Sequence, residues 1–167
     1  QVNLLKEQIE KLSEQRMQLD KQESHLQIQI SQFNGRKKTI EEMEANYEGY
    51  NGAVKFIMKS GLKGIEGVAA DLMKVPSGFE TAVETGLGAA LQNIICLCDE
   101  DVKKAVKALK DNKAGRLTFL PVESVRGSKA SLPDAVISHA GFKGIGSDLV
   151  QYDEKYEGIF RYLLGRT

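Results

Sequence analysis

Gly64-Ile-Glu-Gly67-Val-Ala-Ala-Asp71-Leu72 is followed 77 residues later by Gly141-Phe-Lys-Gly144-Ile-Gly-Ser-Asp148-Leu149. The likeness continues to residue 88 against residue 165, and seven of the 25 aligned pairs are identical. The glycine spacing and the phase of the helical pattern that follows are both kept, which is typical of a duplicated unit. We therefore expect a mixed α/β domain made of two related subdomains, the first copy at about 64–120 and the second at about 141–167.

Each copy predicts a glycine-rich turn, a short strand (68–75; 145–152) and a helix (77–87; 154–164) closed by a left-handed glycine. The first copy continues with a strand at 91–98, a helix at 99–112 capped by Asp99, and a strand at 116–120 stopped by Pro121. Residues 123–139 read as the connector between copies. The second copy ends at Thr167, where the first begins its next strand, so we expect a truncated copy with an exposed edge.

A heptad repeat precedes this domain. Positions spaced by seven, together with two apolar residues at the partner position, form one apolar stripe: Leu5, Ile9, Leu12, Leu19, Leu26, Ile30, Phe33, Ile40 and Tyr47. A stripe of this length predicts one strand of a coiled coil, about 70 Å long. We place the coiled-coil arm at residues 1–48 and the globular domain at 49–167.

The partner position of the heptad is apolar only at Val2, Ile9 and Ile30, and it holds Arg16, Glu23, Lys37 and Glu44 elsewhere. Charges there reduce stability and specify a register or a partner, which favours pairing with another segment of the same protein or with a specific partner. Asn34-Gly35 is expected to loosen one turn of the helix.

Composition narrows the function classes. The formal net charge is zero, with −2 on residues 1–49 and +2 on residues 50–167, which argues against a strong nucleic-acid binder. No apolar run is long enough to span a bilayer, and no secretory start is present. Cys96 and Cys98 read as small buried residues, and with only His25 and His139 besides them we expect no metal site.

Four blocks of sequence together resemble the hinge domain of bacterial structural-maintenance-of-chromosomes (SMC) proteins, the condensin-like ATPases. They are Tyr50-Asn-Gly-Ala-Val54, Gly86-Leu-Gly-Ala-Ala-Leu-Gln-Asn-Ile-Ile95, Gly115-Arg-Leu-Thr-Phe-Leu-Pro121 and Gly144-Ile-Gly-Ser-Asp-Leu-Val150, completed by Tyr156 and Leu163-Leu-Gly165. The resemblance covers about residues 47–167, and the arm lies where the family has one.

The resemblance implies a non-catalytic hinge that forms a homodimer and joins two antiparallel coiled-coil arms, in a protein of chromosome condensation and segregation. It implies Gly141, Gly144 and Gly146 at the dimer interface, where strands meeting edge to edge leave no room for a Cβ atom. It also implies a returning coiled-coil helix as the partner of the arm. ATP and magnesium would belong to head domains of the parent protein, with no cofactor in this fragment, and the location would be cytoplasmic, at the nucleoid.

Family hinges also bind DNA weakly and without sequence specificity. The matching candidates are basic residues of the first hinge helix and of the turns: Lys55, Lys59, Lys63, Arg126, Lys129 and Lys143. Each would contact phosphate rather than bases. For any single lysine a solvated helix face is the simpler interpretation, so the expectation concerns the group.

Parts of the sequence also fit two other classes of function, an enzyme and a protein-binding scaffold. Gly64-x-x-Gly67 and Gly144-x-Gly146 could cradle phosphate, but neither completes a dinucleotide fingerprint and no P-loop motif occurs. Asp71 and Asp148 resemble a catalytic pair, yet equivalent positions in a repeat favour a shared role in turning the backbone. We therefore expect no catalytic residues. The remaining alternative is a coiled-coil scaffold whose globular head binds another protein, and self-association of the head separates it from a hinge.

Overall fold

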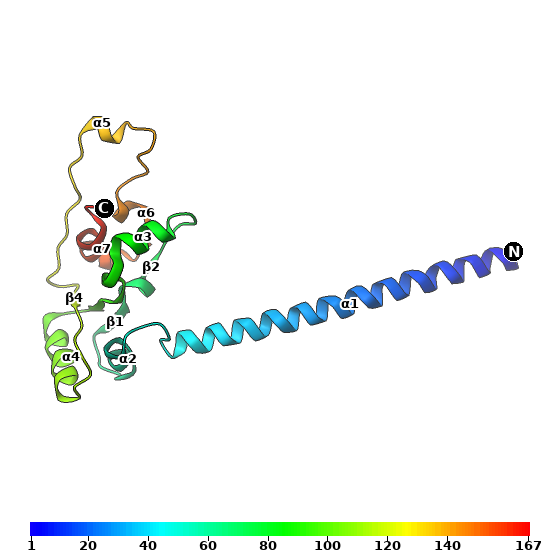
Figure 1. Cartoon of the computed structure of the whole chain (residues 1–167), viewed down its shortest axis with the longest axis horizontal. Helices are drawn as coiled ribbons and strands as arrows, with labels where there is room; N and C mark the ends of the chain where they lie inside the picture. The colour runs from blue at the N-terminus through cyan, green and yellow to red at the C-terminus, as the bar shows by residue number, and fades with distance from the viewer. The chain divides into compact units, whose positions relative to one another are not determined.

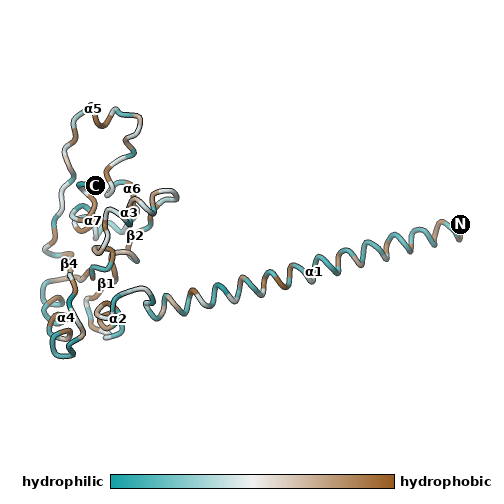
Figure 2. Tube along the Cα trace, viewed as in Figure 1, coloured by the Kyte–Doolittle hydropathy of each residue, from teal (hydrophilic) through white to brown (hydrophobic).

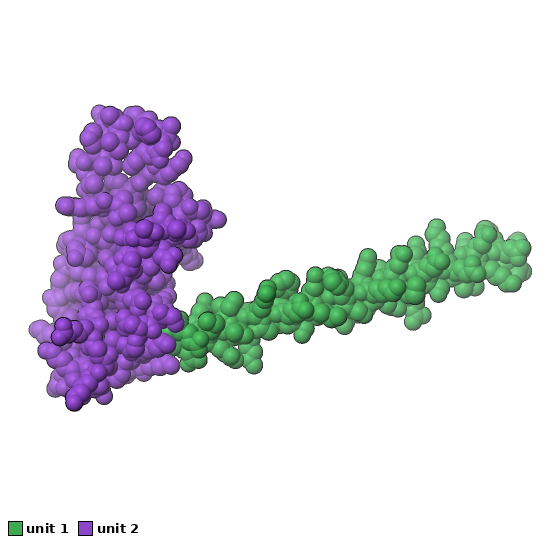
Figure 3. Space-filling model, in the orientation of Figure 1, with its two compact units in different colours: residues 1–48 green, residues 49–167 purple.

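The computed structural model describes all 167 residues, which divide into two compact units, Gln1–Glu48 and Gly49–Thr167 (Figure 3). Each unit has its own internal structure and is described by itself.

The first unit is one helix, α1 (Val2–Ala45), in which apolar and polar residues alternate along the chain (Figures 1 and 2). The apolar stripe is exposed along its whole length; Phe33, for example, is 64% exposed. Two expectations were wrong. Helix α1 runs without interruption through Asn34 and Gly35, so Gly35 does not loosen a turn. Tyr47 lies beyond the helix with φ at +52°, so the helical stripe ends at Ile40.

The second unit contains a three-stranded sheet formed by β1 (Ile65–Val68), β3 (Ile94–Cys96) and β4 (Phe119–Pro121). The central strand, β3, pairs antiparallel with β1 and parallel with β4, and all three of its residues are buried. Helices α2 (Gly52–Lys59) and α4 (Asp99–Asp111) pack against each other and contribute to the core cluster on this sheet. The cap of α4 is Cys98 rather than Asp99, which is the first helical residue.

A two-stranded sheet joins the two copies of the repeat. Strand β2 (Met73–Lys74) comes from the first copy and β5 (Gln151–Tyr152) from the second, and they pair antiparallel. Lys74 lies opposite Gln151, which is its own counterpart 77 residues later. The two copies are therefore related locally by an approximate two-fold axis between these residues.

The helical elements repeat at the same offset. The short helix η1 (Ala69–Leu72) corresponds to α6 (Gly146–Leu149), and α3 (Glu80–Leu87) to α7 (Glu157–Leu164), each 77 residues apart. Asp71 and Asp148 lie in the helical turn that leads into a strand, as expected. The expected strands 68–75 and 145–152 are wrong in their first halves, because this turn interrupts them and leaves two-residue strands. Gly88 has positive φ, but Gly165 has φ −68°, so only the first helix ends on a left-handed glycine.

Two of the three core clusters draw on both copies. One combines Ile95 and Leu120 with Tyr156, Ile159 and Phe160, and another combines Val83 and Leu87 with Val150 and Leu164. Each large side chain that is fully buried contributes about 1.5–3 kcal/mol. The two copies are therefore expected to fold as one unit.

The connector between the copies includes the short helix α5 (Asp134–Ile137), where Val136 and Ile137 are exposed (Figure 1). Its first part lies against α7. A Cβ atom at Gly158 would come within 2.7 Å of the Val125 carbonyl oxygen, and one at Gly127 would overlap the Tyr162 backbone. The glycines allow this close approach of two backbones. The remaining helical turns, η2 (Gly88–Gln92) and η3 (Glu154–Tyr156), flank β3 and α7.

Candidate functional site

Three glycines were expected at a dimer interface, and their surroundings within one chain differ. Gly141 is exposed, and its N–H donates to His139 Nδ1 at 3.0 Å. Gly144 has φ +134°, and a Cβ there would lie 3.2 Å from the side chain of Leu149. Gly146 is buried, and a Cβ there would lie 3.2 Å from the Leu164 carbonyl oxygen. The packing within one subunit therefore already favours glycine at positions 144 and 146.

The first copy shows the same arrangement. Gly67 has φ +153°, and a Cβ there would lie 3.3 Å from the side chain of Leu72. Leu72 follows Gly67 by five residues, just as Leu149 follows Gly144. This backbone conformation strongly favours glycine. The recurrence of the contact indicates that the glycine–leucine pair is part of the repeated fold, and an interface role for Gly144 would be additional to it.

The six basic candidates fall into two groups. Lys55 and Lys59 lie on α2, and exposed Lys63 follows that helix. Arg126 and Lys129 lie on the connector, and Lys143 lies in the turn that opens the second copy. On the connector, Arg126 donates to the Val122 and Val125 carbonyl oxygens, and Lys129 Nζ lies 2.5 Å from Asp148 Oδ1.

The α2 group has neighbours that were not proposed from the sequence as DNA contacts. Helix α4 packs against α2 and carries Lys107 and Lys110 on its exposed face, with Lys113 just beyond. Lys103 and Lys104 are paired with Glu100 and Asp101 on the same helix. The amphipathic pattern of α4 indicates that its lysines face outward. The packing of α4 against α2, which brings the two sets of lysines together, could not be predicted from the sequence.

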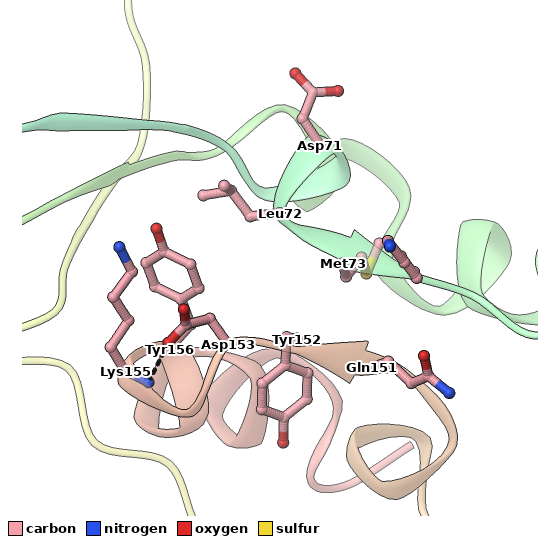
Figure 4. Close-up of a pocket in the computed structure, with 9 residues that line it drawn as sticks. Asp71, Leu72, Met73, Gln151, Tyr152, Asp153, Lys155 and Tyr156 are labelled. Carbon is pink, nitrogen blue, oxygen red and sulfur yellow. Dashed lines mark hydrogen bonds between the residues drawn. The ribbon is translucent and has the colours of Figure 1, made fainter.

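A surface pocket of about 490 Å³ lies where the two copies meet, lined by residues around β2 and β5 (Figure 4). Three of its charged lining residues, Asp71, Asp153 and Lys155, are paired within the chain. Glu66 Oε2 accepts from Lys155 Nζ at 2.5 Å and from the Tyr156 hydroxyl at 2.6 Å. Asp71 accepts from Tyr50 at 2.6 Å, and Asp153 accepts from the Lys155 backbone N–H. The pocket is therefore a polar junction between the copies.

The same pairing shifts the ionisation of this junction. The hydrogen bond from Lys155, and then that from Tyr156, lowers the pKa of Glu66. The bond to Glu66 raises the pKa of Lys155. Burial first, and then the bond to Glu66, raises the pKa of Tyr156. All three shifts favour the paired charge state that joins β1 to the second copy.

The two cysteines are free thiols with different surroundings. Cys96 is buried in β3, and burial raises its pKa to about 12. Cys98 donates its thiol hydrogen to Asp101 Oδ2 at 3.1 Å. No group of three or more His, Cys, Asp or Glu side chains gathers as a metal site requires. No helix is both long and apolar enough to cross a membrane.

An α/β unit built from two related copies therefore follows a long helix with an exposed heptad stripe. Residues 62–167 match the family model "SMC proteins Flexible Hinge Domain", and the chain belongs to this family. Among curated relatives, the chromosome partition protein Smc of Halothermothrix orenii is 42% identical over 137 residues, covering 80% of this chain. That of Bacillus subtilis is 31% identical over 172 residues, covering 99% of this chain. The chain spans 12% and 14% of the length of these two relatives.

Solved structures agree with this assignment. The asymmetric dimer of the Geobacillus stearothermophilus SMC hinge domain matches with a TM-score of 0.77 and 37% identity, over 81% of this chain and 55% of that one. The Pyrococcus furiosus Smc hinge domain with an extended coiled coil matches with a TM-score of 0.61 and 31% identity, over 80% and 46%. The expected mixed α/β hinge fold is confirmed.

Proposed function

We propose that this chain is the dimerisation hinge of a chromosome partition protein, with part of one coiled-coil arm. The observation that carries the proposal is the hinge-family match over residues 62–167, together with the likeness to a hinge domain described as a dimer. The exposed apolar stripe of α1 supports an arm that pairs with a returning helix of the same protein. ATP hydrolysis would lie in heads elsewhere in the whole protein, which would act at the nucleoid in the cytoplasm.

The mass of the full chain in solution tests self-association. A monomer has 18.4 kDa, so a dimer has twice that mass. Sedimentation equilibrium over a range of micromolar concentrations should give the dimer mass, and a monomer throughout would contradict the proposal.

We propose weak, sequence-independent DNA binding through the adjoining faces of α2 and α4. Exposed lysines on two packed helices can contact phosphates along one duplex, while a net charge near zero keeps the affinity low. The pair Lys107→Glu and Lys110→Glu should weaken binding to a labelled duplex and reduce the log K–log salt slope by about 1–2. The matched control is Lys11→Glu with Lys21→Glu on α1, and an equal loss there would show that only net charge matters.

A further inference from the structure

One flank of the α1 stripe is uncharged over residues 8–29. The apolar heptad positions of Leu5, Leu12, Leu19 and Leu26 are position d, and Ile9 and Ile30 are position a. The position just before a, which is position g, holds glutamine in four successive heptads of the helix: Gln8, Gln15, Gln22 and Gln29. Positions e and g normally carry the charges that select a coiled-coil partner. Here the g flank carries amides instead.

The helix itself does not require this choice. Glutamate and lysine have nearly the same helix propensity as glutamine. Both occur at the outward position f of the same helix, as Glu7, Glu14 and Lys21. Over residues 8–29, charge is therefore used on the solvent side of α1 and left out of the g flank, whereas the next g position holds Arg36.

Three of the four charged residues at position a, Arg16, Glu23 and Lys37, have partners on the opposite flank. Arg16 lies 3.9 Å from Asp20, and Lys37 lies 3.6 Å from Glu41. The Gln27 side chain donates to Glu23 Oε1 at 3.1 Å. In each case an a residue is joined to the e residue four positions on. These three side chains thus have a polar partner on their own helix and do not need one from a second helix.

A hollow on the seam shows where a second helix would insert. It has a volume of about 510 Å³ and is lined by residues of positions a, d, e and g: Leu19, Gln22, Glu23, Leu26, Gln27 and Ile30. Coiled coils pack by placing one side chain of the partner into such a hole. The partner's side chains next to the inserted one would face Gln22 and the other glutamines of the g flank.

We propose that α1 selects a helix with an apolar seam and an uncharged flank of amide or hydroxyl side chains, and that it does so by excluding charge. A charged residue facing the glutamines would lose water without meeting a counter-charge, which is unfavourable. The inference rests on the proposed pairing of the arm and specifies the chemistry of its partner. Pairing through such a flank is insensitive to salt, because screening acts on charges.

Binding of designed helices to the full chain tests the inference. Three fluorescent peptides of about five heptads share the same a, d and outer positions and carry only Gln, only Glu or only Lys at e and g. Fluorescence anisotropy is measured with the peptide below its self-association concentration. The Gln peptide should bind at least about tenfold more tightly than either charged peptide, a difference of about 1.4 kcal/mol. Its Kd should change less than about threefold between about 50 and 500 mM salt.

Two double variants of α1 test whether the g-flank glutamines cause the preference for the Gln peptide. The change of Gln15 and Gln22 together to Glu should shift the preference toward the Lys peptide. The matched change of Gln18 and Gln32 to Glu, on the outward position c of the same helix, should leave all three affinities unchanged. Equal or tighter binding of a charged peptide to the unaltered chain would overturn the inference. Failure of the Gln peptide to bind would also overturn it, while a dimeric globular unit would leave the hinge proposal standing.

Discussion

Gly144 and Gly67 form a matched pair that separates the interface role of a glycine from its role in the fold. Both have positive φ, and a Cβ at either would press on the leucine five residues later, at 3.2 and 3.3 Å. Alanine at either position would hold a strained backbone, which costs about 1–3 kcal/mol. A shift of a few tenths of an ångström by Leu149 or Leu72 would relieve the side-chain contact.

The expected result is equal destabilisation but unequal dimerisation. Since domains of this size are stable by about 5–15 kcal/mol, both variants should remain folded at 25 °C. Their melting temperatures, followed by circular dichroism, should fall by a similar amount, roughly 4–15 °C. The dimer Kd, measured by sedimentation below the unfolding range, should rise for Gly144→Ala and stay unchanged for Gly67→Ala.

Two results would refute the reasoning. Equal dimer constants in both variants would show that Gly144 serves only the fold of its own copy. A much larger loss of stability in one variant would show that the two positions are not equivalent. Gly141→Glu adds an independent check, because Gly141 is exposed and the charge should weaken the dimer without unfolding the subunit.

Three further changes test other parts of the account. Phe160→Ala should cost about 3–5 kcal/mol in urea unfolding, more than Val83→Ala at the equivalent position of the first copy, since Phe160 has the larger side chain and is fully buried. Equal losses would contradict that packing. Lys155 lowers the pKa of Glu66, so ionised Glu66 stabilises the fold above its unfolded pKa, and this stabilisation is lost as the pH falls through its folded pKa. Glu66→Gln should therefore flatten the decline in unfolding free energy below about pH 4.5. An unchanged acid slope would exclude this role. Gly35→Ala meets no atom within 4 Å and should raise the helicity of α1 by circular dichroism, by about 1 kcal/mol in helix free energy; no change would mean that Gly35 is not helical in solution.

The repeat was visible in the sequence because both copies keep local signals. Glycine spacing, Asp71 and Asp148, and the helical phase all depend on neighbouring residues, and the structure shows their elements at one offset. The extended strands expected at 68–75 and 145–152 failed because an apolar run does not distinguish a strand from a buried helical turn. The pairing of β2 with β5 and the packing of the connector on α7 are long-range contacts, for which the sequence carries no local signal.

In the arm, too, the local pattern was predictable from the sequence and the features that depend on the rest of the fold were not. The heptad pattern predicted a long helix, and α1 is one. Its end was misplaced, because Tyr47 continues the spacing of seven although its backbone has left the helix. The basic candidates could be recognised as lysines and arginines, but the pairing of Lys129 with Asp148 and the neighbouring lysines of α4 depend on tertiary packing.

The mass of residues 49–167 alone, measured by light scattering, tests the central claim most directly. This part of the chain is a compact unit with its own core, and without α1 no coiled coil can mimic a hinge dimer. A dimer that persists at low micromolar concentration is the predicted result. A monomer at every concentration, from a unit that circular dichroism shows to be folded, would contradict self-association through the globular part.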